Sequence, residues 1–161
     1  MIRLAPEDFE FFDVPIGDLP LYNQDDDGDQ APAVRRMKAA VESADGVLFV
    51  TPEYNRSVPG ALKNALDHGS RPYGATSWAG RSAGIVGVSP GGTGTVAAQQ
   101  HLRTILAFFD MPTFGQPEAY IQWTDGLVNA DGTVGDRSRD FFQGWMNGFA
   151  AFVRKQGAPR A

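Results

Sequence analysis

The chain of 161 residues contains no cysteine and only two histidines, His68 and His101. Without cysteine there can be no disulfide, no thiolate nucleophile and no cysteine-ligated metal. The two histidines lie far apart in the sequence, with no carboxylate motif around them. The acidic run 25–29 (Asp-Asp-Asp-Gly-Asp) resembles a calcium loop, but Val34 stands where such a loop needs a bidentate glutamate. The sequence therefore predicts no metal site.

Basic residues are also scarce, because 14 Lys and Arg face 19 Asp and Glu and leave a net charge of −5. This balance disfavours nucleic acids and anionic membranes, which bind clustered Lys and Arg. No apolar run approaches the roughly 20 residues of a membrane span, and residues 1–8 lack a signal-peptide core. We expect a soluble, cytoplasmic protein whose residues 1–161 form one domain.

Apolar runs and helical spacings alternate along the chain. The strands are continuously apolar rather than alternating, which is typical of a parallel sheet covered by helices on both faces. The fold class predicted from this order is α/β. We expect strands at 9–14, 47–51, 82–88 and within 113–121, and helices at 33–43, 59–67, 95–109 and 136–155.

The stretch 47–60 is the most informative part of the chain. Its apolar run stops at Thr51, the polar sequence Pro-Glu-Tyr-Asn occupies 52–55, and Pro-Gly at 59–60 opens a helical pattern. Open α/β sheets bind ligands at such loops, beyond the carboxyl ends of their strands. The alternative is a plain turn with a helix cap, in which Asn55 or Ser57 is the N-cap.

A second loop, Ser-Pro-Gly-Gly-Thr-Gly at 89–94, follows the next predicted strand. Its glycines let the backbone approach a planar ligand, and its N–H groups lie at a helix N-terminus. It is not a nucleotide-binding P-loop, because no Gly-Lys-Ser/Thr follows. Glycine is common in any tight connection, so only the position of this loop, one strand after the first, favours a ligand site.

Together these motifs closely resemble the signature of the NADPH-dependent FMN reductase family. The match comprises Pro-Glu-Tyr-Asn at 52–55, Pro-Gly at 59–60 and Leu-Lys-Asn-Ala-Leu-Asp at 62–67, and it extends from Phe9 to Arg154. The resemblance implies a flavodoxin-like three-layer sandwich with a parallel sheet of strand order 2-1-3-4-5. It also implies an NAD(P)H-dependent, FMN-containing oxidoreductase that reduces quinone-like, azo or metal-oxyanion acceptors by hydride transfer through the flavin.

The resemblance also implies roles for individual residues. No residue is expected to be a catalytic nucleophile, because hydride transfer to flavin needs none. Backbone N–H groups of the first loop would bind the flavin ring, and Tyr54 would supply apolar contact. The implied assembly is a homodimer or homotetramer with Arg103 and Glu118 near a subunit contact; the alternative is a surface ion pair worth about 0–1 kcal/mol. The implied flavin-binding residues are Pro52, Glu53, Tyr54, Asn55, Ser89, Gly91 and Gly92.

The chain departs from the family pattern at His68, where the family usually carries tryptophan, and in one large respect, because it begins where the family's second strand begins. The first strand, the phosphate loop and most of the first helix have no counterpart, and residues 1–6 resemble the tail of that helix. Three explanations stay open: the true start lies upstream, the strand at 9–14 shifts to pair with 47–51, or another chain supplies the missing edge. The alternative function is a non-catalytic remnant that acts as an oligomerising or weak ligand-binding module.

Overall fold

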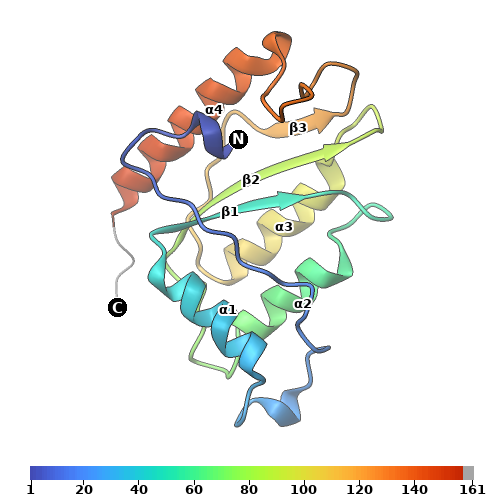
Figure 1. The fold of residues 1–161 in the computed structure, drawn as a ribbon. Coiled ribbons are helices and arrows are strands. Elements are labelled where there is room, and N and C mark those ends of the chain that lie inside the picture. Colours follow the sequence, from blue (N-terminus) through green and yellow to red (C-terminus); the bar gives the residue numbers. More distant parts are fainter. Residues whose placement is uncertain (158–161) are drawn as a thin grey trace.

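The computed structural model describes residues 1–157 and contains a parallel three-stranded sheet (Figure 1). Strands β1 (Gly46–Thr51), β2 (Ser82–Ser89) and β3 (Ala119–Gln122) lie in the order β1-β2-β3. The register pairs Gly46 with Ser82 and Thr51 with Gly87. Because all three strands run the same way, their carboxyl ends and the loops that follow them lie at one edge of the sheet.

Four α-helices accompany the sheet. Helix α1 carries proline at its first position, where a missing N–H costs nothing. Helix α4 ends at Gly157, whose φ of 72° lies in the left-handed region that glycine adopts readily. Across residues 1–157, every helix is too short or too polar to cross a bilayer. The helices are α1 (Pro32–Ser43), α2 (Gly60–Gly69), α3 (Val96–Phe108) and α4 (Asp136–Gln156), with short 3-10 turns η1 (Ile2–Leu4) and η2 (Gln24–Asp26).

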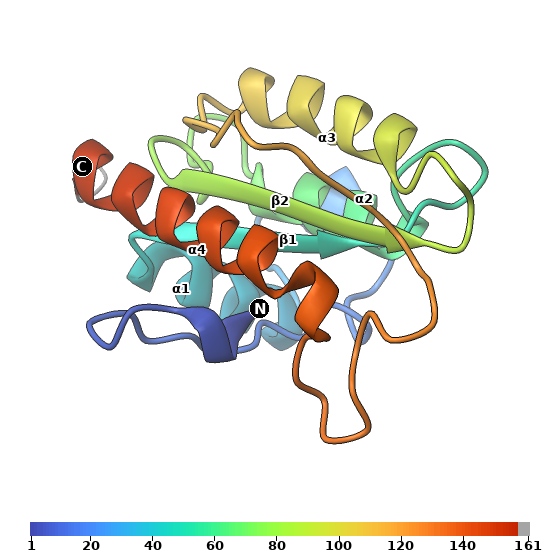
Figure 2. The same ribbon diagram turned by 90° about the horizontal axis from the view of Figure 1, so that it is seen from above.

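The helices form a layer on each face of the sheet. Ile85 and Val86 are consecutive on β2 and therefore point to opposite faces. Ile85 packs in a cluster with Leu66 of α2 and Leu102 of α3, whereas Val86 packs with Trp145 of α4. Figure 2 shows α3 and α4 on opposite sides of the sheet. The expected α/β architecture with a parallel sheet between two helical layers is confirmed.

The strand expected at 9–14 is wrong. These residues are extended but join no strand, and within residues 1–157 no backbone hydrogen bond involves 10–14. A β-strand exists only where a neighbour completes its ladder, and here no neighbour is present on either side. The segment has therefore not shifted onto β1, which is an edge of the sheet and not an interior strand.

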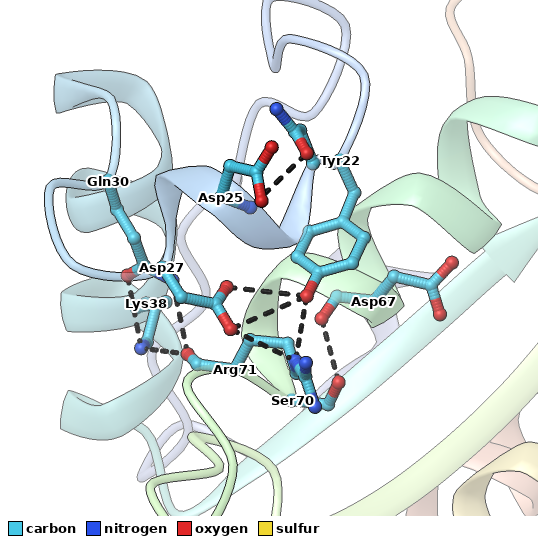
Figure 3. A network of polar contacts seen from close by, with 9 residues as sticks. Tyr22, Asp25, Asp27, Gln30, Lys38, Asp67, Ser70 and Arg71 are labelled. Atoms are coloured by element: carbon cyan, nitrogen blue, oxygen red, sulfur yellow. Dashed lines mark hydrogen bonds and ion pairs between the residues drawn. The ribbon is translucent and has the colours of Figure 1, made fainter.

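The loop before α1 is fastened by side chains, which Figure 3 shows in part. The Asn64 carboxamide accepts the N–H of Tyr22 at 2.8 Å and donates to the carbonyl of Pro20 at 2.8 Å. Nε of Arg71 donates to the Tyr22 hydroxyl at 2.7 Å and lies 3.2 Å from an Asp27 oxygen. These contacts join the loop to the middle of α2 and to Arg71 just after that helix. Asp27, one of the aspartates of the acidic run 25–29, forms an ion pair with Arg71.

Candidate functional site

Three segments meet at the carboxyl edge of the sheet (Figure 1). The first predicted loop follows β1 and the second follows β2, and the pairing of Thr51 with Gly87 places these loops side by side. The third segment follows β3, where the N–H of Trp123 donates to the Ser89 carbonyl at 2.8 Å. The structure thus brings together both loops that the sequence pattern selected and adds a third segment.

The first loop is a tight turn closed by Tyr54 and Ser57. These residues exchange two backbone hydrogen bonds of 3.0 Å, while Asn55 and Arg56 have φ values of 50° and 67°. Two consecutive left-handed residues are typical of a type I′ turn. Asparagine tolerates this conformation better than most residues, whereas arginine adopts it uncommonly. The turn fixes Tyr54 at its base with the side chain 61% exposed, and Pro52 is exposed beside it.

The Glu53 side chain turns away from solvent. Its Oε2 accepts the N–H of Ala98, in the first turn of α3, at 3.1 Å, and the side chain is 10% exposed. A helix N-terminus favours a negative charge, so this contact is electrostatically favourable. Glu53 therefore connects the first loop to the helix that follows the second loop.

The helix-cap alternative for this loop is wrong. The N-cap of α2 is Pro59, which has no capping side chain, and Asn55 lies inside the turn. The hydroxyl of Ser57 instead lies 3.0 Å from Nδ1 of His101. Polar residues 53–57 therefore form the turn and its attachments to α3, leaving the helix start to Pro59.

The second loop presents backbone donors to solvent. Oγ of Ser89 accepts the N–H of Gly91 at 3.2 Å, and the N–H of Gly94 donates to the Gly91 carbonyl at 2.9 Å. Within residues 1–157, the N–H groups of Gly92 and Thr93 have no hydrogen-bond partner, and both residues are exposed. Exposed N–H groups in a glycine-rich turn can bind carbonyl or anionic oxygens of a ligand.

Buried residues that the sequence analysis did not select support both loops. An added Cβ at Gly87 would overlap the Thr95 hydroxyl and lie 2.5 Å from the Thr51 carbonyl oxygen, so only glycine fits. Thr95 is itself buried and receives a hydrogen bond of 2.9 Å from Gln99, which also donates to the Ala119 carbonyl at 2.8 Å. The sequence did contain a signal for this support. Gly87 lies inside an apolar strand, and a glycine there often marks the close approach of another group.

Trp123 and Gln122 were also missed. Trp123 is 51% exposed, which leaves a large aromatic surface beside the second loop. Nε2 of Gln122 reaches the Pro90 carbonyl at 3.4 Å. One feature of the sequence could have identified them: Trp123 is an aromatic residue just after the region 113–121, in which a strand was expected. These residues add apolar and amide surface to the edge that carries both loops.

A polar cluster lies between α3 and the start of β3. Nε of Arg103 is 3.7 Å from Oε1 of Glu118, which confirms the ion pair. The Tyr120 hydroxyl donates to the same oxygen at 2.5 Å and accepts from Gln100 at 2.6 Å. Burial, and then the hydrogen bond to Glu118, raise the pKa of Tyr120. Whether this cluster contacts another subunit stays a prediction.

The site fits a flavin ring better than a flavin phosphate. The exposed Tyr54 ring offers an apolar face, and the unpaired N–H groups of Gly92 and Thr93 suit the carbonyl oxygens of a planar heterocycle. The basic side chains of the first loop and of α2 do not form a phosphate site. Lys63 is paired with Asp67 at 2.7 Å, and the side chain of Arg56 is 78% exposed to solvent. When bound, FMN supplies the hydride-accepting and hydride-donating ring. Within residues 1–157 no cluster of three carboxylate or histidine side chains could hold a metal.

Comparisons with known proteins identify the class. The family model described as NADPH-dependent FMN reductase matches residues 2–125. A 2-hydroxy-1,4-benzoquinone reductase from a Burkholderia species is 48% identical over 155 residues, covering 96% of this chain and 85% of that protein. The chain therefore belongs to the NADPH-dependent FMN reductase family, a family of oxidoreductases.

Solved structures agree with this membership. The flavoenzyme FerB, an NAD(P)H:(acceptor) oxidoreductase from Paracoccus denitrificans, superposes with a TM-score of 0.92 at 44% identity, covering 96% of this chain and 86% of that chain. A WrbA-like flavodoxin from Agrobacterium tumefaciens is 18% identical, with a TM-score of 0.52 over 81% of this chain and 78% of its own. This second likeness concerns the fold alone and confirms the flavodoxin-like expectation.

Proposed function

We propose that this protein is an NAD(P)H-dependent FMN reductase that passes electrons to small quinones. The observation that carries the proposal is the pair of adjacent loops at 52–57 and 89–94, joined by the hydrogen bond between Glu53 and Ala98 and opening toward solvent. Support also comes from the 2-hydroxy-1,4-benzoquinone reductase that covers nearly the whole chain.

The proposed roles follow from the geometry of each loop. Tyr54 contacts the ring through its exposed aromatic face, and Pro52 and Asn55 flank it in the turn. Exposed N–H groups of the second loop, framed by Ser89, Gly91 and Gly92, hold the ring's oxygens. Glu53 acts indirectly, because its carboxylate positions the first loop on α3. The chain's own residues thus bind and orient the ring.

Ring binding and turnover separate this enzyme from a non-catalytic remnant. FMN is titrated into the purified chain while flavin fluorescence is followed, and NADPH oxidation is then measured with a benzoquinone as acceptor. We expect saturable binding and quinone-dependent oxidation of NADPH. A folded chain that binds no flavin and turns over no quinone would favour the remnant instead.

Tyr54 provides the residue-level test. Because its contribution is the aromatic face, Tyr54→Ala should weaken flavin binding about tenfold, whereas Tyr54→Phe should bind as the parent does. Replacing Glu53, Tyr54 and Asn55 together by alanine should lower both flavin retention and turnover. Unchanged turnover in this triple variant would refute the assignment of the first loop.

The assembly and the compartment are further parts of the proposal. We propose a homodimer or homotetramer with the Arg103–Glu118 ion pair near the subunit contact, and a cytoplasmic location suited to NADPH. Sedimentation of the parent and of Arg103→Ala tests the assembly. A monomeric parent, or an unchanged oligomer in the variant, would remove the cluster from that contact.

A further inference from the structure

One of the three tryptophans differs from the other two in its surroundings. Trp78 and Trp145 lie in the two core clusters and are 3% and 1% exposed, whereas Trp123 is 51% exposed. A tryptophan is highly buried on average, because its large aromatic surface gains free energy on leaving water. The place of Trp123 in the fold, rather than its exposure alone, indicates a function.

Trp123 is held against the second loop. Its N–H donates to the Ser89 carbonyl at 2.8 Å, directly after the register pairs Gln122 with Ser89. The amide nitrogen of Gln122 lies 4.0 Å from the position of a Cβ added to Gly92, and it makes only a long contact of 3.4 Å to the Pro90 carbonyl. An indole and a weakly engaged amide therefore flank the second loop on the side of β3.

Tyr54 lies on the other side of the same loop. β2 lies between β1 and β3, and neighbouring strands are about 4.8 Å apart, so the ends of β1 and β3 are separated by about 10 Å (Figure 1). The carboxyl edge thus carries a row of three features: the turn with Tyr54, the second loop, and Trp123. Under the proposed function Tyr54 and the second loop hold the flavin ring, which leaves Trp123 for the second reactant.

We infer that Trp123 determines acceptor specificity by stacking on the outer ring of a neutral, fused-ring quinone such as a naphthoquinone. A benzoquinone has only the ring that must meet the flavin. A naphthoquinone carries a second aromatic ring that projects beyond the first, and the indole offers an aromatic surface for it. The Gln122 amide can donate to a quinone carbonyl, which adds a polar group to an apolar contact. The inference rests on the proposed function and names its substrate class.

The charges around Trp123 favour an uncharged acceptor. Residues 119–125 contain no lysine, arginine or histidine and one carboxylate, Asp125, which is exposed, and residues 89–94 carry no charged side chain. An anionic quinone would meet a like charge there and no side-chain cation from these two segments. Naphthoquinone should therefore bind more tightly than a naphthoquinone sulfonate, and added salt should narrow the difference.

Binding without turnover is the first test. The whole chain is saturated with oxidised FMN, and the binding of naphthoquinone and of benzoquinone is measured by equilibrium dialysis in the absence of NADPH. The chain has no cysteine, so quinones have no thiol to arylate. Trp123→Ala should weaken naphthoquinone binding about tenfold and benzoquinone binding less than about threefold, whereas Trp123→Phe should retain most of the affinity for both.

Turnover provides a second readout. The ratio of kcat/KM for naphthoquinone to that for benzoquinone should fall about tenfold in Trp123→Ala, through a higher KM for naphthoquinone. The reduction of bound FMN by NADPH, followed without any quinone, should keep the parent rate.

Phe108→Ala is the matched control. Phe108 is 84% exposed and is the last residue of α3, and the Asp110 carbonyl just beyond it accepts the N–H of Gly80 at 3.0 Å, shortly before β2 begins. The control therefore removes an exposed aromatic ring at the opposite edge of the sheet, and it should change neither ratio. Circular dichroism checks that all variants are folded.

Three outcomes would overturn the inference. Equal losses for the two quinones in Trp123→Ala would remove the fused-ring contact. Slower reduction of FMN by NADPH in this variant would place Trp123 at the nicotinamide instead. An oligomer that Trp123→Ala dissociates in sedimentation would show that a second copy covers the indole. In each case quinone turnover by the parent would leave the proposed function standing, whereas a parent that binds no flavin would refute that function and this inference with it.

Discussion

The carboxylate of Glu53 accepts a hydrogen bond from the N–H of Ala98, 45 residues further along the chain, at 3.1 Å. The contact joins the loop after β1 to the helix after the second loop. We expect Glu53→Ala to lower the free energy of unfolding by about 1–2 kcal/mol, because an N–H of the first turn loses its acceptor. Urea denaturation measures this change. Glu53→Gln keeps an acceptor and should lose less than half as much; equal losses would assign the effect to charge.

Gly87 should be intolerant of any side chain. An added Cβ would meet the Thr95 hydroxyl and the Thr51 carbonyl oxygen, and the latter belongs to a paired strand that cannot move away. Gly87→Ala should therefore destabilise the fold by about 1–3 kcal/mol in thermal or urea unfolding. Gly91→Ala is the control, because its Cβ would lie 3.6 Å from Oγ of Ser89, an ordinary contact. Equal stability of the two variants would contradict the packing around β2.

Riboflavin should bind this chain nearly as well as FMN does. The phosphate of FMN is a dianion, and the basic residues of the first loop, of α2 and of the segment just after α2 are Arg56, Lys63 and Arg71. Arg71 lies in the Asp27 ion pair, Lys63 binds Asp67, and none of the three lies in a glycine-serine loop at a helix N-terminus. Parallel titrations of FMN and riboflavin decide the question. A strong preference for FMN would reveal a phosphate site formed by other residues.

The N-terminal segment should loosen from α4 at acid pH. Hydrogen bonds from Arg154 lower the pKa of Asp8 below its ordinary value. A carboxyl with a lowered pKa stabilises the fold at pH values above its unfolded pKa of about 3.9, and this contribution disappears as the pH falls through the lower folded pKa. The melting temperatures of the parent and Asp8→Asn should therefore differ at neutral pH and converge at strongly acid pH.

Asp13→Asn is the control for this pH dependence, because Asp13 is exposed and, among residues 1–157, has no ion-pair partner. Its melting temperature should follow that of the parent across the same pH range. A gap between the parent and Asp8→Asn that persists at strongly acid pH would mean that the contact of Arg154 over the Phe9 ring, at 5.0 Å, responds to the substitution.

Most elements were predictable because their signals are local. The helix expected at 33–43 is observed at Pro32–Ser43, and the strand expected at 82–88 is observed at Ser82–Ser89. Apolar periodicity within one element is enough for such assignments. The strand expected within 113–121 begins only at Ala119, since Gly115 and Pro117 interrupt the ladder and leave an isolated bridge at Thr113.

Pairing between distant segments could not be predicted in the same way. Residues 9–14 have strand-like composition, but a strand also needs a neighbour, and no local pattern shows whether one is present. The Glu53 contact depends on Ala98, and the support of Gly87 depends on Thr95, so both arise only in the folded chain. That the 161 residues form one domain stays a prediction, which a single cooperative unfolding transition would support.

The two hydrogen bonds that Asn64 makes to Tyr22 and Pro20 have a practical consequence for probing the chain with proteases. Residues 10–31 are attached mainly by side chains, so this segment can open without global unfolding. It contains neither lysine nor arginine, and trypsin would therefore leave it intact even when it detaches. A protease that cleaves at aspartate would find Asp13 and Asp18 there, and its cutting rate would rise in Asn64→Ala while the tryptic pattern of this region stayed the same.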